Sequence, residues 1–87
     1  MGNQNRKASA DILWRLSTNL KRLRQARGYT QQQLADLSGL SNSYISNVEQ
    51  GTVNISLANL EALANGLGCA EEDLLRRPMT GGASREP

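Results

Sequence analysis

The sequence has 87 residues, a formal net charge of +2 and a hydrophobic fraction of 38%. A chain of this length forms one domain with a small core. Because it holds one Trp, two Tyr and no Phe, that core has to be built from Leu, Ile, Val and Ala. A single cysteine excludes an internal disulfide. No apolar run approaches the ~18 residues of a membrane span, and the polar N-terminus lacks the apolar stretch of a signal peptide. We therefore expect a cytoplasmic protein with no membrane partner.

The composition also argues against an enzyme. The chain has no histidine, so the lone Cys69 has no imidazole base to activate it, and no cluster of metal ligands is visible. The one carboxylate cluster, Glu71-Glu72-Asp73, is explained as the acidic first turn of a helix. We expect no catalytic residue, no metal, no cofactor and no small-molecule ligand.

Charge is distributed unevenly along the chain. Residues 1–35 carry seven bases and one acid, Asp11, whereas residues 36–73 carry six acids and no base. A basic half fits a surface that faces a polyanion, but a solvated basic helix face would show the same pattern. Charge alone therefore does not decide between these interpretations.

Caps and apolar spacing predict a helical domain over residues 10–77, between a flexible basic arm (residues 1–9) and a disordered tail (residues 78–87). The first helix covers about residues 10–27 and ends before Gly28. Its apolar stripe consists of Ile12, Leu16, Leu20 and Leu23. Trp14 falls nearly opposite this stripe, where it would be exposed against the tail or at a subunit contact.

Two short helices follow. Thr30 and Gln33 predict a capping box for a helix over residues 31–38, with an inner side of Leu34, Ala35 and Leu37 and an end at Gly39. Ser41 is the predicted N-cap of a helix over residues 42–50, closed by Gly51, whose inward residues are Ile45 and Val48.

Ser56 is the predicted N-cap of a fourth helix, which Gly68 ends. We expect its buried stripe to comprise Leu57, Leu60, Leu63, Ala64 and Leu67. Ile55 can pack on Leu60 as a hydrophobic staple. A fifth helix over about residues 70–76 has acids in its first turn and Arg76 at its end, and Cys69 before it is expected to pack as a small apolar residue. The fold class is therefore all-α, with five helices.

The segment from Thr30 to Gly51 indicates a function, because two short helices joined by a tight turn with a glycine are typical of a helix-turn-helix. The second helix of such a unit lies in the major groove of DNA. Short polar side chains point outward from it here, namely Asn42, Ser43, Ser46 and Asn47. Asn can bond adenine bidentately, whereas an exposed helix with no such role would more often carry Glu and Lys, which form helices better. The pattern predicts a helix that reads bases.

The chain resembles the Cro/repressor-type helix-turn-helix family, also called the xenobiotic-response-element family, of bacterial and phage transcription regulators. The resemblance covers about residues 16–75. It is carried by Leu23-Arg24, Gly28-Tyr29-Thr30-Gln31, Leu34-Ala35, Gly39-Leu40-Ser41, Tyr44-Ile45-Ser46, Val48-Glu49-Gln50-Gly51, Leu57 through Gly68, and Leu74. It implies a compact five-helix bundle of the lambda-repressor-like type with the helix-turn-helix at the second and third helices.

The resemblance also implies roles for individual residues. Base contacts fall to Asn42, Ser43 and Asn47. Contacts to phosphate or backbone fall to Gln31, Gln32, Ser41, Tyr44, Ser46, Arg22 and Arg27. Arg24 and Glu49 match a largely buried ion pair between the first and third helices. In contrast to many members, the third helix has no Lys or Arg, so phosphate contacts have to come from Gln31, helix N-termini and bases such as Arg6 and Lys7.

The expected partners are double-stranded operator DNA and a second copy of the chain, because one helix contacts few base pairs and paired half-sites restore specificity. The expected dimer surface lies near residues 67–75. A repressor, an activator and a restriction-modification controller all stay open. The alternative is a module that binds a partner protein, such as an antitoxin, for which the acidic half, Trp14 and the tail offer surfaces.

Overall fold

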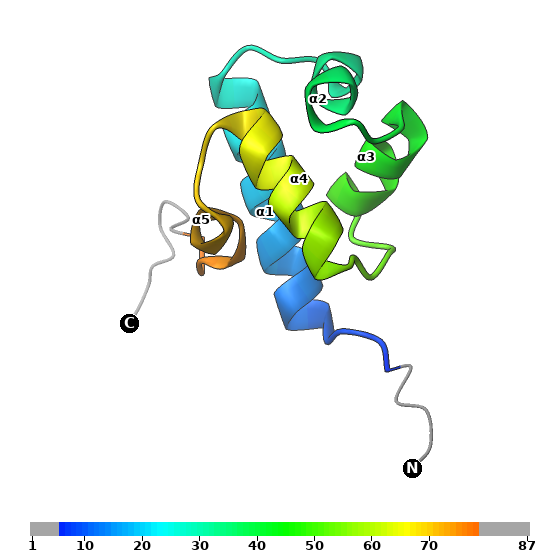
Figure 1. The fold of residues 1–87 in the computed structure, drawn as a ribbon. Coiled ribbons are helices and arrows are strands. Elements are labelled where there is room, and N and C mark those ends of the chain that lie inside the picture. Colours follow the sequence, from blue (N-terminus) through cyan, green and yellow to red (C-terminus); the bar gives the residue numbers. More distant parts are fainter. Residues whose placement is uncertain (1–5, 79–87) are drawn as a thin grey trace.

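The computed structural model describes residues 6–78, and these form five α-helices and no β-strand. The helices are α1 (Ala10–Ala26), α2 (Gln31–Ser38), α3 (Asn42–Glu49), α4 (Leu57–Leu67) and α5 (Glu71–Leu75). Figure 1 shows α2 and α3 together on one side of the molecule and α5 on the other. The predicted all-α, five-helix fold class is confirmed. Residues 1–5 of the predicted arm and 79–87 of the predicted tail lie outside the described residues.

Local signals in the sequence set the helix boundaries. The side chains of Ser9, Thr30, Ser41 and Ser56 each accept a hydrogen bond from the backbone N–H three residues later. These bonds satisfy amides that have no partner inside the helix. Helices α2 and α4 end at glycines, Gly39 and Gly68, which take the left-handed conformation at φ 75° and 71°.

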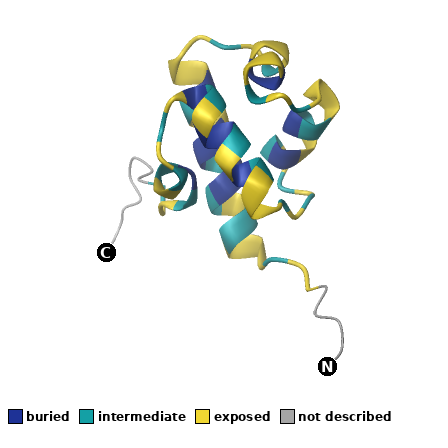
Figure 2. Ribbon diagram, viewed as in Figure 1, coloured by how far each residue is buried: buried dark blue, intermediate teal, exposed yellow. Residues whose placement is uncertain are grey.

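The core is aliphatic and draws on all five helices, as the composition requires. Helix α1 packs against α3 and α5, and α2 packs against α3 and α4. Figure 2 shows the buried residues on the sides of the helices that face one another. The buried hydrophobic residues are Leu16, Leu20, Leu34, Ala35, Ile45, Val48, Leu60, Leu63, Ala64, Leu67 and Leu74.

The prediction that Leu37 belongs to the inner side of α2 is wrong, because its side chain is 53% exposed. Successive residues of a helix are turned by about 100°. The core direction of α2 lies between Leu34 and Ala35, and it is therefore nearer to Ser38 than to Leu37. Ser38 faces α4 at so short a distance that a Cβ added to Gly66 would be 3.2 Å from the Ser38 Cβ.

The prediction that Leu57 belongs to the buried stripe of α4 is also wrong, because Leu57 is 83% exposed. It is the first residue of α4 and lies beyond the part of the helix that its neighbours cover. Two residues of the expected dimer surface near residues 67–75 are not available to a partner, whereas Leu75 in the same range is only partly buried. Leu67 is 2% exposed and Leu74 is fully buried, so both belong to the core of one chain.

The C-terminal end of α5 is held by a buried asparagine that the sequence analysis did not single out. Asn19 of α1 is fully buried, and its Nδ2 donates to the carbonyls of Leu74 at 3.0 Å and Arg76 at 2.7 Å. Arg15 donates to the Leu75 carbonyl at 3.2 Å. Since the last carbonyls of a helix lack partners within it, these bonds fix α5 on α1. None of the helices between residues 6 and 78 has the length and hydrophobicity that a membrane crossing requires.

Candidate nucleic-acid interface

Helices α2 and α3 form a helix-turn-helix in which one side of α3 is buried and the other is exposed. Ile45 and Val48 have relative exposures of 0% and 1% and anchor α3 to the core. Asn42, Ser43 and Asn47, the predicted base-reading residues, are all exposed on the remaining surface of this helix. Figure 2 shows this exposed surface of α3 turned away from the rest of the bundle. The structure therefore gathers the three predicted residues on one accessible face.

A buried ion pair fixes α3 to α1. Arg24 Nε donates to Glu49 Oε2 at 2.6 Å and Arg24 Nη2 donates to Oε1 at 3.1 Å, which makes the pair bidentate. The side chains of Arg24 and Glu49 are 11% and 4% exposed. Arg24 Nη1 also donates to the Tyr29 carbonyl at 2.7 Å, before α2 begins. The hydrogen bond to Glu49 raises the pKa of Arg24 above its ordinary value, so the guanidinium stays charged.

Gln31 joins the same network at the start of α2. Its Nε2 donates to Glu49 Oε1 at 3.1 Å, and the residue is only half-buried. The first residue of α2 is thus tied to the last residue of α3. This arrangement holds the two helices of the helix-turn-helix at a fixed angle, and it leaves the remaining surface of Gln31 accessible.

Other residues predicted to contact the DNA backbone are partly engaged in local contacts. The Tyr44 hydroxyl accepts a hydrogen bond from Asn59 of α4 at 3.0 Å. Gln50 donates to Ser46 Oγ at 3.4 Å, and Gln32 donates to Asp36 at 3.0 Å. The Ser41 hydroxyl caps α3. These side chains lie on or beside α2 and α3, as a contact with the margin of a DNA site requires.

The two predicted bases on α1 lie in different places. Arg22 and its neighbour Lys21, which the sequence analysis left out of the site, line a hollow together with Glu49 of α3. Arg22 also donates to Asn19 at 3.1 Å. Arg27 is exposed at the far end of α1, close enough to Cys69 for its charge to act on that thiol. The structure thus brings Arg22, but not Arg27, to α3.

Sequence reasoning missed the role of Asn54, in the loop between α3 and α4. Asn54 Oδ1 accepts from the Ala8 N–H at 2.8 Å, and Asn54 Nδ2 donates to the Arg6 carbonyl at 3.2 Å. These bonds place residues 6–8, which we call the arm segment, against the loop. An asparagine in an exposed loop gives no local signal for a partner 46 residues away.

A capped two-helix unit whose second helix has an exposed polar face defines the class of protein: the chain forms a helix-turn-helix domain of the kind found in Cro/repressor-type transcription regulators. The model of the helix-turn-helix family HTH_3 matches residues 20–74, and the chain belongs to this family. The members of this family are DNA-binding transcription regulators, not enzymes.

Two solved structures show the same fold. The restriction-modification controller protein C.AhdI from Aeromonas hydrophila is 42% identical, with a TM-score of 0.69 over 71% of this chain and 94% of that chain. The hypothetical transcription factor NHTF from Neisseria is 33% identical, with a TM-score of 0.77 over 90% of this chain and 91% of that chain.

Two curated relatives are matched over only part of their length. The competence pilus inhibition repressor of Acinetobacter baylyi is 52% identical over 48 residues, which are 55% of this chain and 44% of the relative. A curated Neisseria meningitidis hypothetical transcription factor is 40% identical over 63 residues, 72% of this chain and 59% of the relative. The chain thus spans about half the length of these two curated relatives.

Proposed function

We propose that this chain is a transcriptional repressor that binds a palindromic operator as a dimer, with α3 in the major groove. The observation that carries the proposal is the exposed row of Asn42, Ser43 and Asn47 on α3, in a helix whose other side is anchored in the core. Asn can donate and accept on the N6 and N7 edge of adenine, and Ser can bond either partner of a base pair. These three side chains are the proposed base contacts.

Backbone contacts surround this row in the proposed complex. Gln31, Gln32 and Ser41 lie at the start of α2 and α3, where unpaired amides and the helix dipole favour phosphate. Tyr44 and Ser46 are half-buried residues of α3 and lie beside the row of proposed base contacts. Arg22 adds a positive charge next to the C-terminal end of α3. Such contacts position a protein on DNA without reading its sequence.

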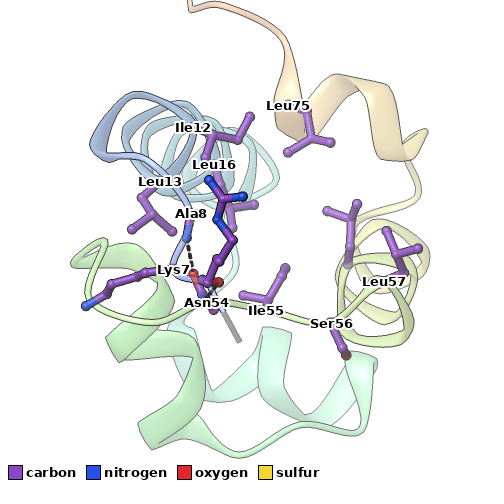
Figure 3. Close-up of a pocket in the computed structure, with 12 residues that line it drawn as sticks. Lys7, Ala8, Ile12, Leu13, Leu16, Asn54, Ile55, Ser56, Leu57 and Leu75 are labelled. Atoms are coloured by element: carbon purple, nitrogen blue, oxygen red, sulfur yellow. Dashed lines mark hydrogen bonds between the residues drawn. The ribbon is translucent and has the colours of Figure 1, made fainter. Parts of the chain in front are cut away.

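The proposed dimer surface is an apolar groove of about 570 Å³ beside α4, shown in Figure 3. Its apolar lining includes Ile12, Leu16, Ile55, Leu60 and Leu75. Leu57, 83% exposed, stands at the edge of the groove.

In a two-fold dimer the same patch is used twice, so the Leu57 of each copy can enter the groove of the other.

A restriction-modification controller is a second candidate, and one observation favours it. The similarity to C.AhdI covers 94% of that controller, whereas the similarity to the Acinetobacter repressor covers 44% of that protein. Reporter genes placed behind the promoters of the genes beside the chain's own gene distinguish the two roles, because a restriction-modification controller is expected to act on genes for a nuclease and a methyltransferase. The predicted cytoplasmic location belongs to this proposal, because operator DNA lies in the cytoplasm of a bacterium.

Selection from randomised duplex DNA tests the proposal, with the wild-type chain and an Asn42→Ala/Asn47→Ala variant side by side at near-physiological salt. We expect the wild type to enrich a palindrome whose half-sites lie about one helical turn apart. We expect the variant to stay folded and to lose the site. A folded wild-type chain that enriches no site would overturn the proposal and favour the alternative of a protein partner.

A further inference from the structure

Asn54 holds the arm segment in a defined place. Its side-chain oxygen and nitrogen bond the Ala8 N–H at 2.8 Å and the Arg6 carbonyl at 3.2 Å, in the manner of one strand residue pairing with a neighbouring strand. Figure 3 shows the bond between Ala8 and Asn54. Asn54 itself is exposed, so this clamp fixes surface backbone and takes no part in the core.

The clamp places Lys7 beside the C-terminal end of α3, and it places Arg6 next to Lys7 at the edge of the apolar groove. Lys7 lines a hollow of about 420 Å³ together with Gln50 and Gly51, which directly follow α3. In Figure 3, Lys7 extends away from Leu57 and Leu75 on the opposite side of the groove. Arg6 and Lys7 are exposed, and within residues 6–78 neither has a carboxylate partner.

The charge of α3 makes this placement significant. The helix carries no Lys or Arg, and its one acid, Glu49, is paired with Arg24. Phosphate neutralisation supplies most of the non-specific affinity of a DNA-binding protein, so it has to come from elements next to α3. Three other bases between residues 6 and 78 are already paired with acids, namely Arg15 with Asp11, Arg76 with Asp73 and Arg77 with Asp11.

We propose that Asn54 is a positioning residue for DNA binding, which holds Arg6 and Lys7 where they contact phosphates at the flank of the stretch that α3 reads. The inference rests on the proposed function. A fixed arm segment loses less conformational freedom when it meets DNA than a free one. Asn54 therefore strengthens binding through the arm segment and without a charge of its own.

The test measures binding to a mixed-sequence duplex of about 30 base pairs, or three helical turns, by fluorescence anisotropy over a series of salt concentrations. Four chains are compared: wild type, Asn54→Ala, Arg6→Ala/Lys7→Ala, and the triple variant. Two controls match them. Asn65→Ala removes another exposed asparagine, and Arg76→Ala/Arg77→Ala removes two charges near α5.

We expect Arg6→Ala/Lys7→Ala to lower the slope of log K against log salt by about 1.8, since each phosphate contact contributes about 0.9. Arg76→Ala/Arg77→Ala should leave the slope close to that of the wild type. Asn54→Ala should raise Kd about 3- to 10-fold in the wild-type chain, the loss of one or two hydrogen bonds. In the arm-neutral background it should change Kd little, because the residue acts through Arg6 and Lys7.

Equal effects of Asn54→Ala in both backgrounds would overturn the inference, since Asn54 would then touch DNA directly or act through the fold. An unchanged Kd of Asn54→Ala in the wild-type background would overturn it as well. Equal salt slopes for Arg6→Ala/Lys7→Ala and Arg76→Ala/Arg77→Ala would also overturn it. Binding to this mixed-sequence duplex does not depend on base contacts from α3. The site selection with Asn42 and Asn47 can therefore fail while this test succeeds, and the reverse is equally possible.

Discussion

Arg24 of α1 and Glu49 of α3 form a bidentate ion pair, with nitrogen–oxygen distances of 2.6 Å and 3.1 Å, beneath the surface that carries the exposed face of α3. Gln31 adds a third hydrogen bond to the same carboxylate at 3.1 Å. One carboxylate thus joins α1, α2 and α3. The orientation of α3 depends on this group as well as on the packing of Ile45 and Val48.

Removing one member of this pair leaves the other buried and unpaired. We expect Glu49→Ala to lower the free energy of unfolding by about 3–5 kcal/mol, a large part of the total for a domain of this size. Asn47→Ala, on the exposed face of the same helix, should change it by less than about 0.5 kcal/mol and weaken specific binding instead. Thermal melts of both variants check this, and a less stable Asn47→Ala would contradict it.

Asn19 is the polar residue on which the position of α5 depends. Asn19→Ala leaves the carbonyls of Leu74 and Arg76 without their shared donor in the interior, which we expect to destabilise the chain by about 1–3 kcal/mol. Urea denaturation gives the magnitude. Hydrogen exchange should show faster opening of α5 than of α3, and uniform protection across the chain would argue against a local role for Asn19.

Gly66 allows α4 to approach α2 closely. A Cβ at this position would lie 3.2 Å from Leu34 Cδ1 and 3.3 Å from the Ser38 backbone nitrogen. Alanine favours a helix over glycine by about 1 kcal/mol, but overpacking costs about 1–3 kcal/mol, and a backbone atom cannot rotate away.

We therefore expect Gly66→Ala to lower the melting temperature and, because α2 has to shift, to weaken DNA binding. Asn65→Ala on the exposed side of α4 is the control for helix propensity alone. A more stable Gly66→Ala would show that α2 can yield.

Leu57 is the residue that tests the proposed dimer surface. Leu57→Asn should leave the stability of the monomer within about 0.5 kcal/mol of the wild type, because the side chain is 83% exposed. We expect it to raise the dimer dissociation constant, measured by sedimentation over a range of protein concentrations. Leu37→Asn, at a residue 53% exposed on α2, is the matched control. An effect of Leu37→Asn equal to that of Leu57→Asn would contradict the proposed surface.

Cys69 is expected to be unreactive in the folded chain. Burial is the main cause that raises the pKa of its thiol above the ordinary value, and the charge of Asp73 adds to it. Since the thiolate is the reactive form, a disulfide reagent near pH 8 should modify the native chain more slowly than the chain unfolded in guanidinium. Equal rates in the two states would contradict the burial of this thiol. Because the pKa of Cys69 is higher in the folded chain than in the unfolded chain, the thiol's contribution to stability is fully present below the unfolded-state pKa. That contribution is lost as the pH rises through the folded-state pKa.

The sequence by itself determined the helices and the exposed polar face of α3, because both depend on interactions within a few residues. The hydroxyls of Thr30 and Ser41 cap helices three residues away, and Gly39 provides the left-handed turn between them. Once Ile45 and Val48 are buried, helical geometry alone turns Asn42, Ser43 and Asn47 outward. The pairing of Arg24 with Glu49, implied by family resemblance, is present in the structure.

Only the tertiary structure decided which apolar residues stay exposed and which polar residues are bound. Leu37 and Leu57 have helical spacings typical of core residues, yet no neighbouring element covers them. Asn19 and Asn54 find their partners 55 and 46 residues away along the chain. Periodicity gives the face of a helix, but how much of that face is covered depends on where the other helices end. For that reason the groove beside Leu57 and the clamped arm segment became visible only in the folded chain.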